Sequence, residues 1–145
     1  MAEFKLTIAD PKSGKCYKKE AKDAEAEVFI GLNLGETVKG DSFGMPGYEL
    51  KITGGSDYCG FPMRSGIMGT RKKVVLHGSV GYSGNMRPIK KGRSPRRQDG
   101  IRKRKTVCGH KIHSKIVQIN LAILKEGSKG ISEIFGKAEA PAEAK

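Results

Sequence analysis

A block of basic side chains between residues 90 and 105 has the most distinctive chemistry in this sequence. Nine of its sixteen residues are Lys or Arg, one is acidic, and only Ile101 is a large apolar residue, so the block cannot form a core of its own. Like charges packed this closely repel one another, and a polyanion relieves that repulsion. Because Gly92, Pro95 and Gly100 interrupt any regular helix, we predict an irregular arm whose side chains contact phosphate groups.

The net charge of +13 at pH 7 lies almost entirely in the middle third of the chain. Residues 64–115 carry 16 Lys or Arg and one carboxylate, Asp99, whereas residues 1–63 and 116–145 are close to neutral. This distribution indicates nucleic acid as the first candidate partner and an anionic membrane surface as the second. The flanking regions are typical of an ordinary fold that carries a basic segment.

A soluble, cytoplasmic protein with no membrane partner is expected. The residues after Met1 do not have the pattern of a secretory signal. The longest apolar run, residues 116–124, is about half as long as a membrane-spanning helix. Three widely spaced cysteines do not suggest a disulfide framework, and they fit a reducing compartment.

The sequence also contains groups that could form a metal site. Cys108, His110 and His113, together with Cys16 or Cys59, contain zinc-ligating groups, but their spacing matches no common zinc module and a CxxC pair is missing. We therefore predict no metal and no other cofactor, and we expect the two histidines to lie beside nucleic acid.

No catalytic motif of the GxSxG, HExxH or Walker type occurs, and the basic region lacks paired carboxylates. The sequence therefore predicts neither an enzyme nor a small-molecule substrate. An enzyme acting on RNA would have to draw its site from the acidic first third, for example from Asp41, Glu49 and Asp57.

Short strands separated by turn residues dominate the predicted elements. Residues 4–8 alternate apolar and polar side chains and, with the turn at 10–14, predict a hairpin with residues 15–18. Short apolar runs at 48–52 and 74–76 lie among frequent glycines, and residues 116–124 form the clearest strand of the second half. This pattern predicts a mainly β fold, namely a small barrel-like domain rather than a parallel α/β sheet.

Helical structure is expected to be minor. An acidic, Ala-rich stretch after Asp23 predicts one short helix, with an inward face formed by Ala24, Val28, Phe29 and Leu32. Ile131, Ile134 and Phe135 have the spacing of a single inward-facing helical turn. Residues 137–145 are rich in Ala and Glu and are predicted to be a disordered tail.

Two motifs add a family resemblance to this interpretation. The stretch GGSDYCGFPMR at 54–64 and the stretch RRQDGIRKRKTV at 96–107 resemble the signature segments of ribosomal protein S6e. The resemblance extends from about Phe4 to Leu124. Cys108-Gly109-His110 departs from the family pattern, in which a basic residue is expected before the glycine.

The resemblance implies a non-catalytic protein of the small ribosomal subunit that binds 16S-type rRNA and contacts neighbouring small-subunit proteins. Archaeal origin is favoured, because the eukaryotic members continue into a long basic helix with regulatory serines, which this Ala/Glu-rich tail does not imply. The expected organisation is one rRNA-binding domain over residues 1–136, with the basic arm at 87–111 and a tail at 137–145.

Within the first motif, Gly54-Gly55 and Ser56-Asp57 are expected to form a tight turn, and Gly60-Phe61-Pro62 a second one. Phe61 and Met63 have two possible roles, either as core residues or as exposed groups that stack on RNA bases.

Arginine and lysine side chains of the basic region are the predicted phosphate contacts, because they match phosphate oxygens as bidentate forks or as point charges. A transient RNA-binding assembly or translation factor remained the alternative function. The predicted rRNA-binding residues are Arg64, Arg71, Lys72, Lys73, Arg87, Lys90, Lys91, Arg93, Arg96, Arg97, Arg102, Lys103, Arg104, Lys105 and Lys111.

Overall fold

The structure is a computed structural model that describes residues 3–82, 102–127 and 130–135. The predicted tail at 137–145 and most of the basic block lie outside the described residues. Strands dominate the described part of the chain, which confirms the predicted mainly β fold. In chain order the elements are β1 (Glu3–Ala9), β2 (Cys16–Lys22), α1 (Ala24–Glu27), β3 (Thr37–Lys39), the 3-10 turn η1 (Gly40–Phe43), β4 (Glu49–Asp57), β5 (Arg71–Leu76), β6 (Lys103–Cys108), β7 (Ile116–Lys125) and α2 (Ile131–Ile134).

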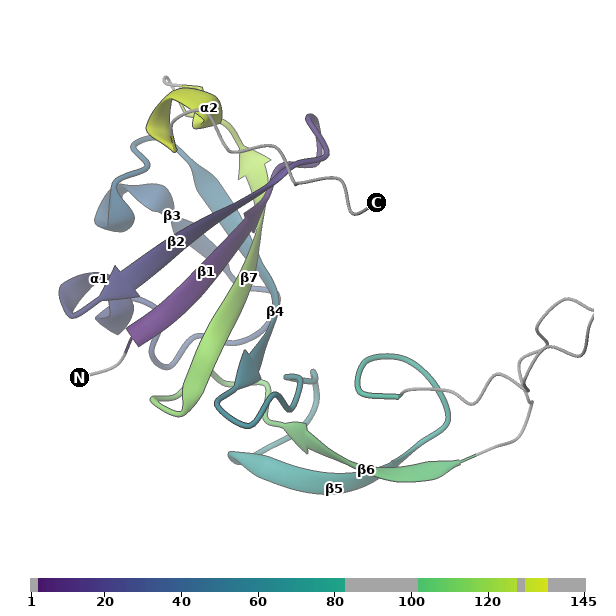
Figure 1. The fold of residues 1–145 in the computed structure, drawn as a ribbon. Coiled ribbons are helices and arrows are strands. Elements are labelled where there is room, and N and C mark those ends of the chain that lie inside the picture. The colour runs from purple at the N-terminus through teal and green to yellow at the C-terminus, as the bar shows by residue number, and fades with distance from the viewer. Residues whose placement is uncertain (1–2, 83–101, 128–129, 136–145) are drawn as a thin grey trace, which may run out of the picture.

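Five strands form one curled sheet in the order β2-β1-β7-β4-β3 (Figure 1). The predicted hairpin is present as β1 and β2, which pair antiparallel with Ile8 opposite Tyr17. The strand predicted over residues 116–124 is β7, which pairs parallel to β1 and antiparallel to β4. The first strand, β1, and the last strand, β7, are therefore neighbours inside the sheet. The curl of the sheet gives the barrel-like shape.

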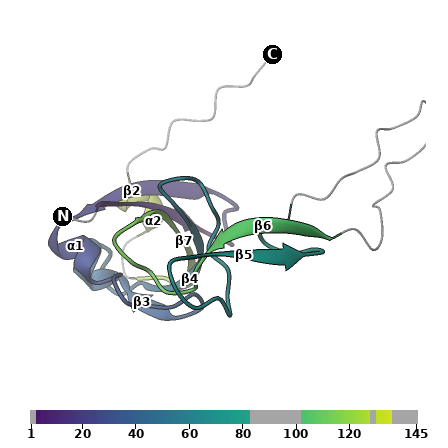
Figure 2. The same cartoon turned by 90° about the horizontal axis from the view of Figure 1, so that it is seen from below.

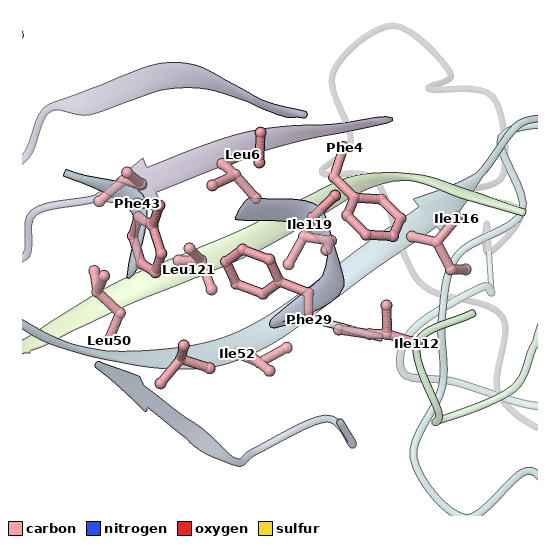
Figure 3. Packing of buried hydrophobic residues seen from close by; sticks show 14 of the residues in the cluster. Phe4, Leu6, Phe29, Phe43, Leu50, Ile52, Ile112, Ile116, Ile119 and Leu121 are labelled. Carbon is pink, nitrogen blue, oxygen red and sulfur yellow. The ribbon is translucent and has the colours of Figure 1, made fainter. Parts of the chain in front are cut away.

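The concave side of this sheet encloses the core (Figure 3). Phe29 is fully buried near its centre, with its ring 5.4 Å from that of Phe43 and 6.4 Å from that of Phe4. Alternate residues of β1, namely Phe4, Leu6 and Ile8, point into the core as the period-two pattern requires. Burial of one such side chain contributes about 1.5–3 kcal/mol to folding.

The helix predicted after Asp23 exists as α1, but it has only four residues. The chain then tightens into turns in which the amides of Phe29 and Ile30 bond to the carbonyls three residues earlier. This tightening places Phe29 in the core and shifts the inward face. Ala26 is therefore buried and Ala24 is exposed, so the predicted inward position of Ala24 was wrong.

The second helical turn, α2, confirms the prediction for residues 131–135. Ile131, Ile134 and Phe135 are partly buried against the core, and the Phe135 ring stacks on Tyr17 with the ring centroids 5.3 Å apart. No helix among the described residues is long and apolar enough to cross a membrane.

Strands β5 and β6 form a separate two-stranded antiparallel ribbon that projects from the side of the curled sheet (Figure 2). Residues 103–108, which the sequence assigned to an irregular arm, are therefore a regular strand in the structure. The glycine and proline residues that argued for irregularity, Gly92, Pro95 and Gly100, all precede this strand and lie outside the described residues.

Candidate nucleic-acid interface

The β5–β6 ribbon brings two basic runs together that are about thirty residues apart in the sequence. In its register Lys73 is opposite Thr106, Val74 is opposite Lys105, and Val75 is opposite Arg104. Pairs directly opposite each other in an antiparallel ladder project on the same side. The ribbon therefore carries basic side chains from both strands on each of its two faces.

One face of the ribbon is open to solvent. Lys73, Val75 and Arg104 lie on this side and are all exposed, and Val75 retains 57% of its accessible surface. We call this set of three residues the open face. Two cations beside an apolar side chain on a narrow extended element can follow a phosphate backbone and contact sugars at the same time.

The other face is partly covered by the chain that follows β5. Leu76 and Val107 are buried there. A Cβ atom added to Gly81 would lie 2.9 Å from the Val107 side chain and 3.4 Å from Leu76, so the segment around Gly81 approaches this face closely. The ribbon is therefore supported on one side and available on the other.

An ion pair between the buried Asp57 and the partly exposed Arg71 holds the start of β5 against the end of β4. The Arg71 Nε donates a hydrogen bond to Asp57 Oδ2 at 2.6 Å, and the Asp57 side chain is almost completely buried. The backbone amides of Cys59 and Phe61 donate to Asp57 Oδ1, each at 2.9 Å. The Asp57 carboxylate therefore stabilises the turn that follows it, through the amides of Cys59 and Phe61, and holds the base of the ribbon through Arg71.

The charge state of this pair follows from these contacts. Burial alone would raise the pKa of Asp57, but the hydrogen bonds from Arg71, Phe61 and Cys59 outweigh it and lower the pKa below the usual value. The hydrogen bond to Asp57 likewise raises the pKa of Arg71 above its usual value. Both groups are therefore ionised at neutral pH.

Two aromatic rings complete this arrangement. The Arg71 guanidinium lies over the Tyr58 ring at 4.7 Å from its centroid and over the Phe61 ring at 5.1 Å. Such cation–π contacts orient a planar guanidinium. We call Asp57, Tyr58, Phe61 and Arg71 the root cluster of the ribbon.

The end of β6 at Cys108, which lies at the base of the ribbon beside Arg71, is fastened to the rest of the domain by backbone hydrogen bonds. The Cys108 amide donates to the Pro62 carbonyl at 2.9 Å, and the Gly109 amide donates to Thr70 at 3.1 Å. Further along, the Ile112 amide donates to Leu32 at 2.8 Å. A Cβ on Gly109 would lie 1.8 Å from the Gly69 carbonyl oxygen, so only glycine fits this crossing. The ribbon therefore leaves the core from a fixed base.

Comparison with known proteins now supplies a family. The family model for ribosomal protein S6e matches residues 4–136. The chain belongs to the ribosomal protein S6e family. It is 38% identical over 144 residues to the small ribosomal subunit protein eS6 of Methanoculleus marisnigri, covering 99% of this chain and 100% of that protein. It is 42% identical to the eS6 protein of Archaeoglobus fulgidus, covering 94% and 98% of the two chains.

A third S6e relative, the eS6 protein of Methanocaldococcus jannaschii, is 40% identical over 137 residues and the match covers 93% of its length. These relatives are archaeal, in keeping with the expected origin. The family assignment confirms the resemblance drawn from the two sequence motifs, and S6e proteins are a non-enzymatic family.

The predicted contact residues of this S6e chain fall into distinct environments. Lys72, Lys73 and Arg104 are exposed on the ribbon, and Lys103 and Lys105 are half-exposed there. Arg102 and Lys111 are exposed beyond its two ends. Six predicted residues lie outside the described residues: Arg87, Lys90, Lys91, Arg93, Arg96 and Arg97.

Two predicted contacts also have partners inside the protein. Arg64 donates from Nη1 to the Val80 carbonyl at 2.7 Å, which ties the segment after β5 to the signature motif. Arg71 is the arginine of the root cluster, so its charge is already matched by Asp57. These two arginines hold the ribbon's surroundings in place in addition to any contact with RNA.

The glycine pair of the S6e motif does not form the predicted turn. Gly54 and Gly55 lie within β4, next to a register shift in its pairing with β7. A Cβ on Gly55 would lie 2.5 Å from the Gln118 carbonyl oxygen, so this glycine permits close approach of two strands and does not supply a positive φ. The second predicted turn is present, with the Gly60 amide bonded to the Asp57 carbonyl.

The same motif resolves the two interpretations of its apolar residues. Met63 is buried in the core, so it is unavailable for stacking on RNA. Phe61 is half-buried beneath Arg71. The sequence interpretation named Asp57 but missed its ion pair with Arg71, because nothing in the local pattern reveals a partner fourteen residues away.

The candidate metal ligands have internal hydrogen-bonding partners. Cys108 is buried and donates from Sγ to the Thr70 carbonyl at 3.0 Å, and burial raises the pKa of its thiol. His113 Nε2 lies 3.7 Å from this sulfur, whereas His110 Nδ1 faces the Ile67 carbonyl at 2.7 Å. Within the described ranges, no group of three or more His, Cys, Asp or Glu side chains is arranged to hold a metal ion.

The three carboxylates that were considered for catalysis also have local partners. Asp41 accepts from the Gly47 amide, Glu49 accepts from Lys125 Nζ, and Asp57 belongs to the root cluster. Each is used to hold local structure.

Proposed function

We propose that this chain is a structural constituent of the small ribosomal subunit and that its basic ribbon and arm bind the 16S-type rRNA. The β5–β6 ribbon carries this proposal, because it gathers two basic runs on a supported element whose open face presents Lys73 and Arg104. The names of the archaeal relatives, small ribosomal subunit protein eS6, agree with it. Residues 1–136 act as one rRNA-binding unit in the cytoplasmic subunit, beside neighbouring subunit proteins.

The electrostatics set the scale of the expected binding. If the ribbon and arm neutralise about six to nine phosphates, log affinity falls with log salt at a slope of about −4 to −8. Such contacts position the protein, whereas recognition rests on RNA shape and 2′-hydroxyl groups. No catalytic role is proposed.

The test compares two double variants of the full chain in binding to transcribed 16S-type rRNA over a salt series. Lys73→Gln with Arg104→Gln removes two charges from the open face. Lys5→Gln with Lys18→Gln removes two charges from exposed positions on β1 and β2. The open-face variant should make the slope less negative by about 1.4–1.8, because each lost phosphate contact removes about 0.7–0.9. The β1–β2 variant should leave the slope close to that of the parent.

Equal effects of the two variants would show that net charge alone attracts the RNA, and the proposed ribbon contact would be wrong. A sucrose gradient of native lysate then separates a constituent from a transient factor. Stoichiometric recovery in small subunits is expected, and recovery mainly in light fractions or only on precursor particles would contradict the structural role.

A further inference from the structure

A small cavity opens at the root of the ribbon, and none of the three open-face residues lines it. It has a volume of about 150 Å³ and is lined by Asp57, Tyr58, Thr70, Arg71, His113 and Lys115. Sites for drug-sized ligands are larger, about 300–1,000 Å³. The cavity is therefore too small to enclose a complete free cofactor, but it can hold part of a nucleotide that belongs to a polymer and extends beyond it.

Tyr58 gives the cavity an aromatic wall that is unusually exposed. The residue retains 61% of its accessible surface, whereas the large aromatic residues of the core are buried. The residue is nevertheless held in place, because its amide donates to the Lys115 carbonyl at 3.2 Å and Arg71 lies over its ring. Arg71 covers part of this ring, and the part that stays exposed is held on a fixed backbone. Such a ring has little conformational entropy to lose on binding, as a stacking platform requires.

The polar groups of the cavity leave one cation available at its rim. Asp57 already accepts hydrogen bonds from Arg71 and from two backbone amides, so its negative charge is compensated within the protein. The Lys115 amide donates to His113 Nδ1 at 3.2 Å, and His113 Nε2 is the nitrogen that faces Cys108 Sγ. Among the described residues that line the cavity, the exposed Lys115 carries an ammonium group that can meet an anion.

A flat aromatic wall beside an ammonium matches the chemistry of a nucleotide. A base is a planar ring that stacks on tyrosine, and its phosphate is an anion that pairs with lysine. Thr70 and Arg71 lie at the start of β5, so a strand of RNA that follows the ribbon passes the cavity. We propose that the cavity binds one unpaired nucleotide of the RNA, with its base on Tyr58 and its phosphate on Lys115. This inference rests on the proposed function.

The test uses the full chain and transcribed 16S-type rRNA, with two matched pairs of variants. Tyr58→Leu removes the aromatic ring and keeps an apolar side chain, whereas Tyr58→Phe keeps the ring. Tyr58→Leu should weaken binding about 5- to 150-fold without changing the salt slope, because stacking is not ionic. Tyr58→Phe should bind within about twofold of the parent, since any base presents a face to either ring.

Lys115→Gln should make the salt slope less negative by about 0.7, and Lys115→Arg should leave it unchanged. Chemical probing of the RNA should show one nucleotide that is protected by the parent and by Tyr58→Phe but exposed with Tyr58→Leu. Photo-cross-linking of the unaltered protein should yield a Tyr58 peptide that carries a nucleotide, and this measurement does not depend on the folding of any variant.

The outcomes separate the two proposals. If Tyr58→Leu binds like the parent while Lys73→Gln with Arg104→Gln weakens binding, the nucleotide site is wrong and the ribbon contact stands. Equal losses in Tyr58→Leu and Tyr58→Phe would overturn the stacking account. Cross-links on ribbon peptides but not on the Tyr58 peptide would overturn it as well. If neither the ribbon variant nor the Tyr58 variants change binding, the proposed function is contradicted, and the nucleotide site that rests on it is contradicted as well.

Discussion

The Asp57–Arg71 ion pair allows the sharpest prediction about stability. Asp57→Asn keeps an oxygen that can accept from the amides of Cys59 and Phe61, but it places a neutral amide against the guanidinium. The lost interaction is one charge-assisted hydrogen bond, so the free energy of unfolding should fall by about 1.5–3 kcal/mol. Asp57→Ala also leaves the two amides without their acceptor and should therefore cost about 1–3 kcal/mol more than Asp57→Asn.

The assay is urea unfolding followed by circular dichroism, because the chain has no tryptophan to report by fluorescence. A cycle with Arg71→Gln isolates the coupling between the two side chains, which should be about 0.5–3 kcal/mol. The Lys12–Glu126 pair is the matched control, with an N–O distance of 3.1 Å but side chains that are 76% and 45% exposed. Glu126→Gln should cost about 0–1 kcal/mol, since solvent screens an exposed pair.

An ion pair that is removed from water does not always add to the free energy of unfolding, because the desolvation of the two charges offsets their attraction. The reasoning therefore fails if Asp57→Asn costs no more than Glu126→Gln. It also fails if Asp57→Asn and Asp57→Ala are equally destabilising, because the two amide bonds to Oδ1 would then contribute nothing.

Two further predictions concern the close approach of two strands and stability in acid. Gly55→Ala should lower the free energy of unfolding by about 1–3 kcal/mol, because its Cβ meets the Gln118 carbonyl. Gly54→Ala has its nearest contact at 3.9 Å, so it should be neutral or stabilising by up to about 1 kcal/mol. Equal urea midpoints for the two variants would contradict this. Hydrogen bonds lower the pKa of Asp57, of Asp10 through Ser13, and of Glu36 through Asn33. The unfolded chain therefore binds more protons in acid, and stability that is complete above the ordinary carboxyl pKa of about 4 should decline as the pH falls below it. Urea midpoints measured from neutral pH downward should show a shallower decline for Asp57→Asn, and an unchanged profile would exclude Asp57 as a contributor.

Local patterns predicted the elements whose partners are close in sequence. The β1–β2 hairpin followed from alternation and from the turn residues at 10–14, and α2 followed from the spacing of Ile131, Ile134 and Phe135. In these cases the chain folds back on itself within a few residues, so turn chemistry and periodicity contain most of the information.

Pairings between distant segments were beyond the same reasoning. Strands β1 and β7 pair although most of the chain separates them. Strands β5 and β6 pair although residues 77–102 lie between them. Gly55 illustrates the limit, because its lack of a side chain matters only once Gln118 lies beside it. A glycine pair read locally indicates a turn, whereas in this sheet it marks a close crossing of two strands.

The candidate site was predicted by charge but not by geometry. The sequence identified a basic region with a single carboxylate, Asp99, and treated its cations as equivalent phosphate contacts. The structure distinguishes them, because Arg71 finds its counter-ion in Asp57 at the end of β4, outside that region. Arg71 thereby fixes the ribbon to the curled sheet, whereas Lys73 and Arg104 of the open face are exposed to solvent. A protein that must present like charges to a polyanion gains from this division, because an anchored ribbon does not have to be ordered again each time it binds.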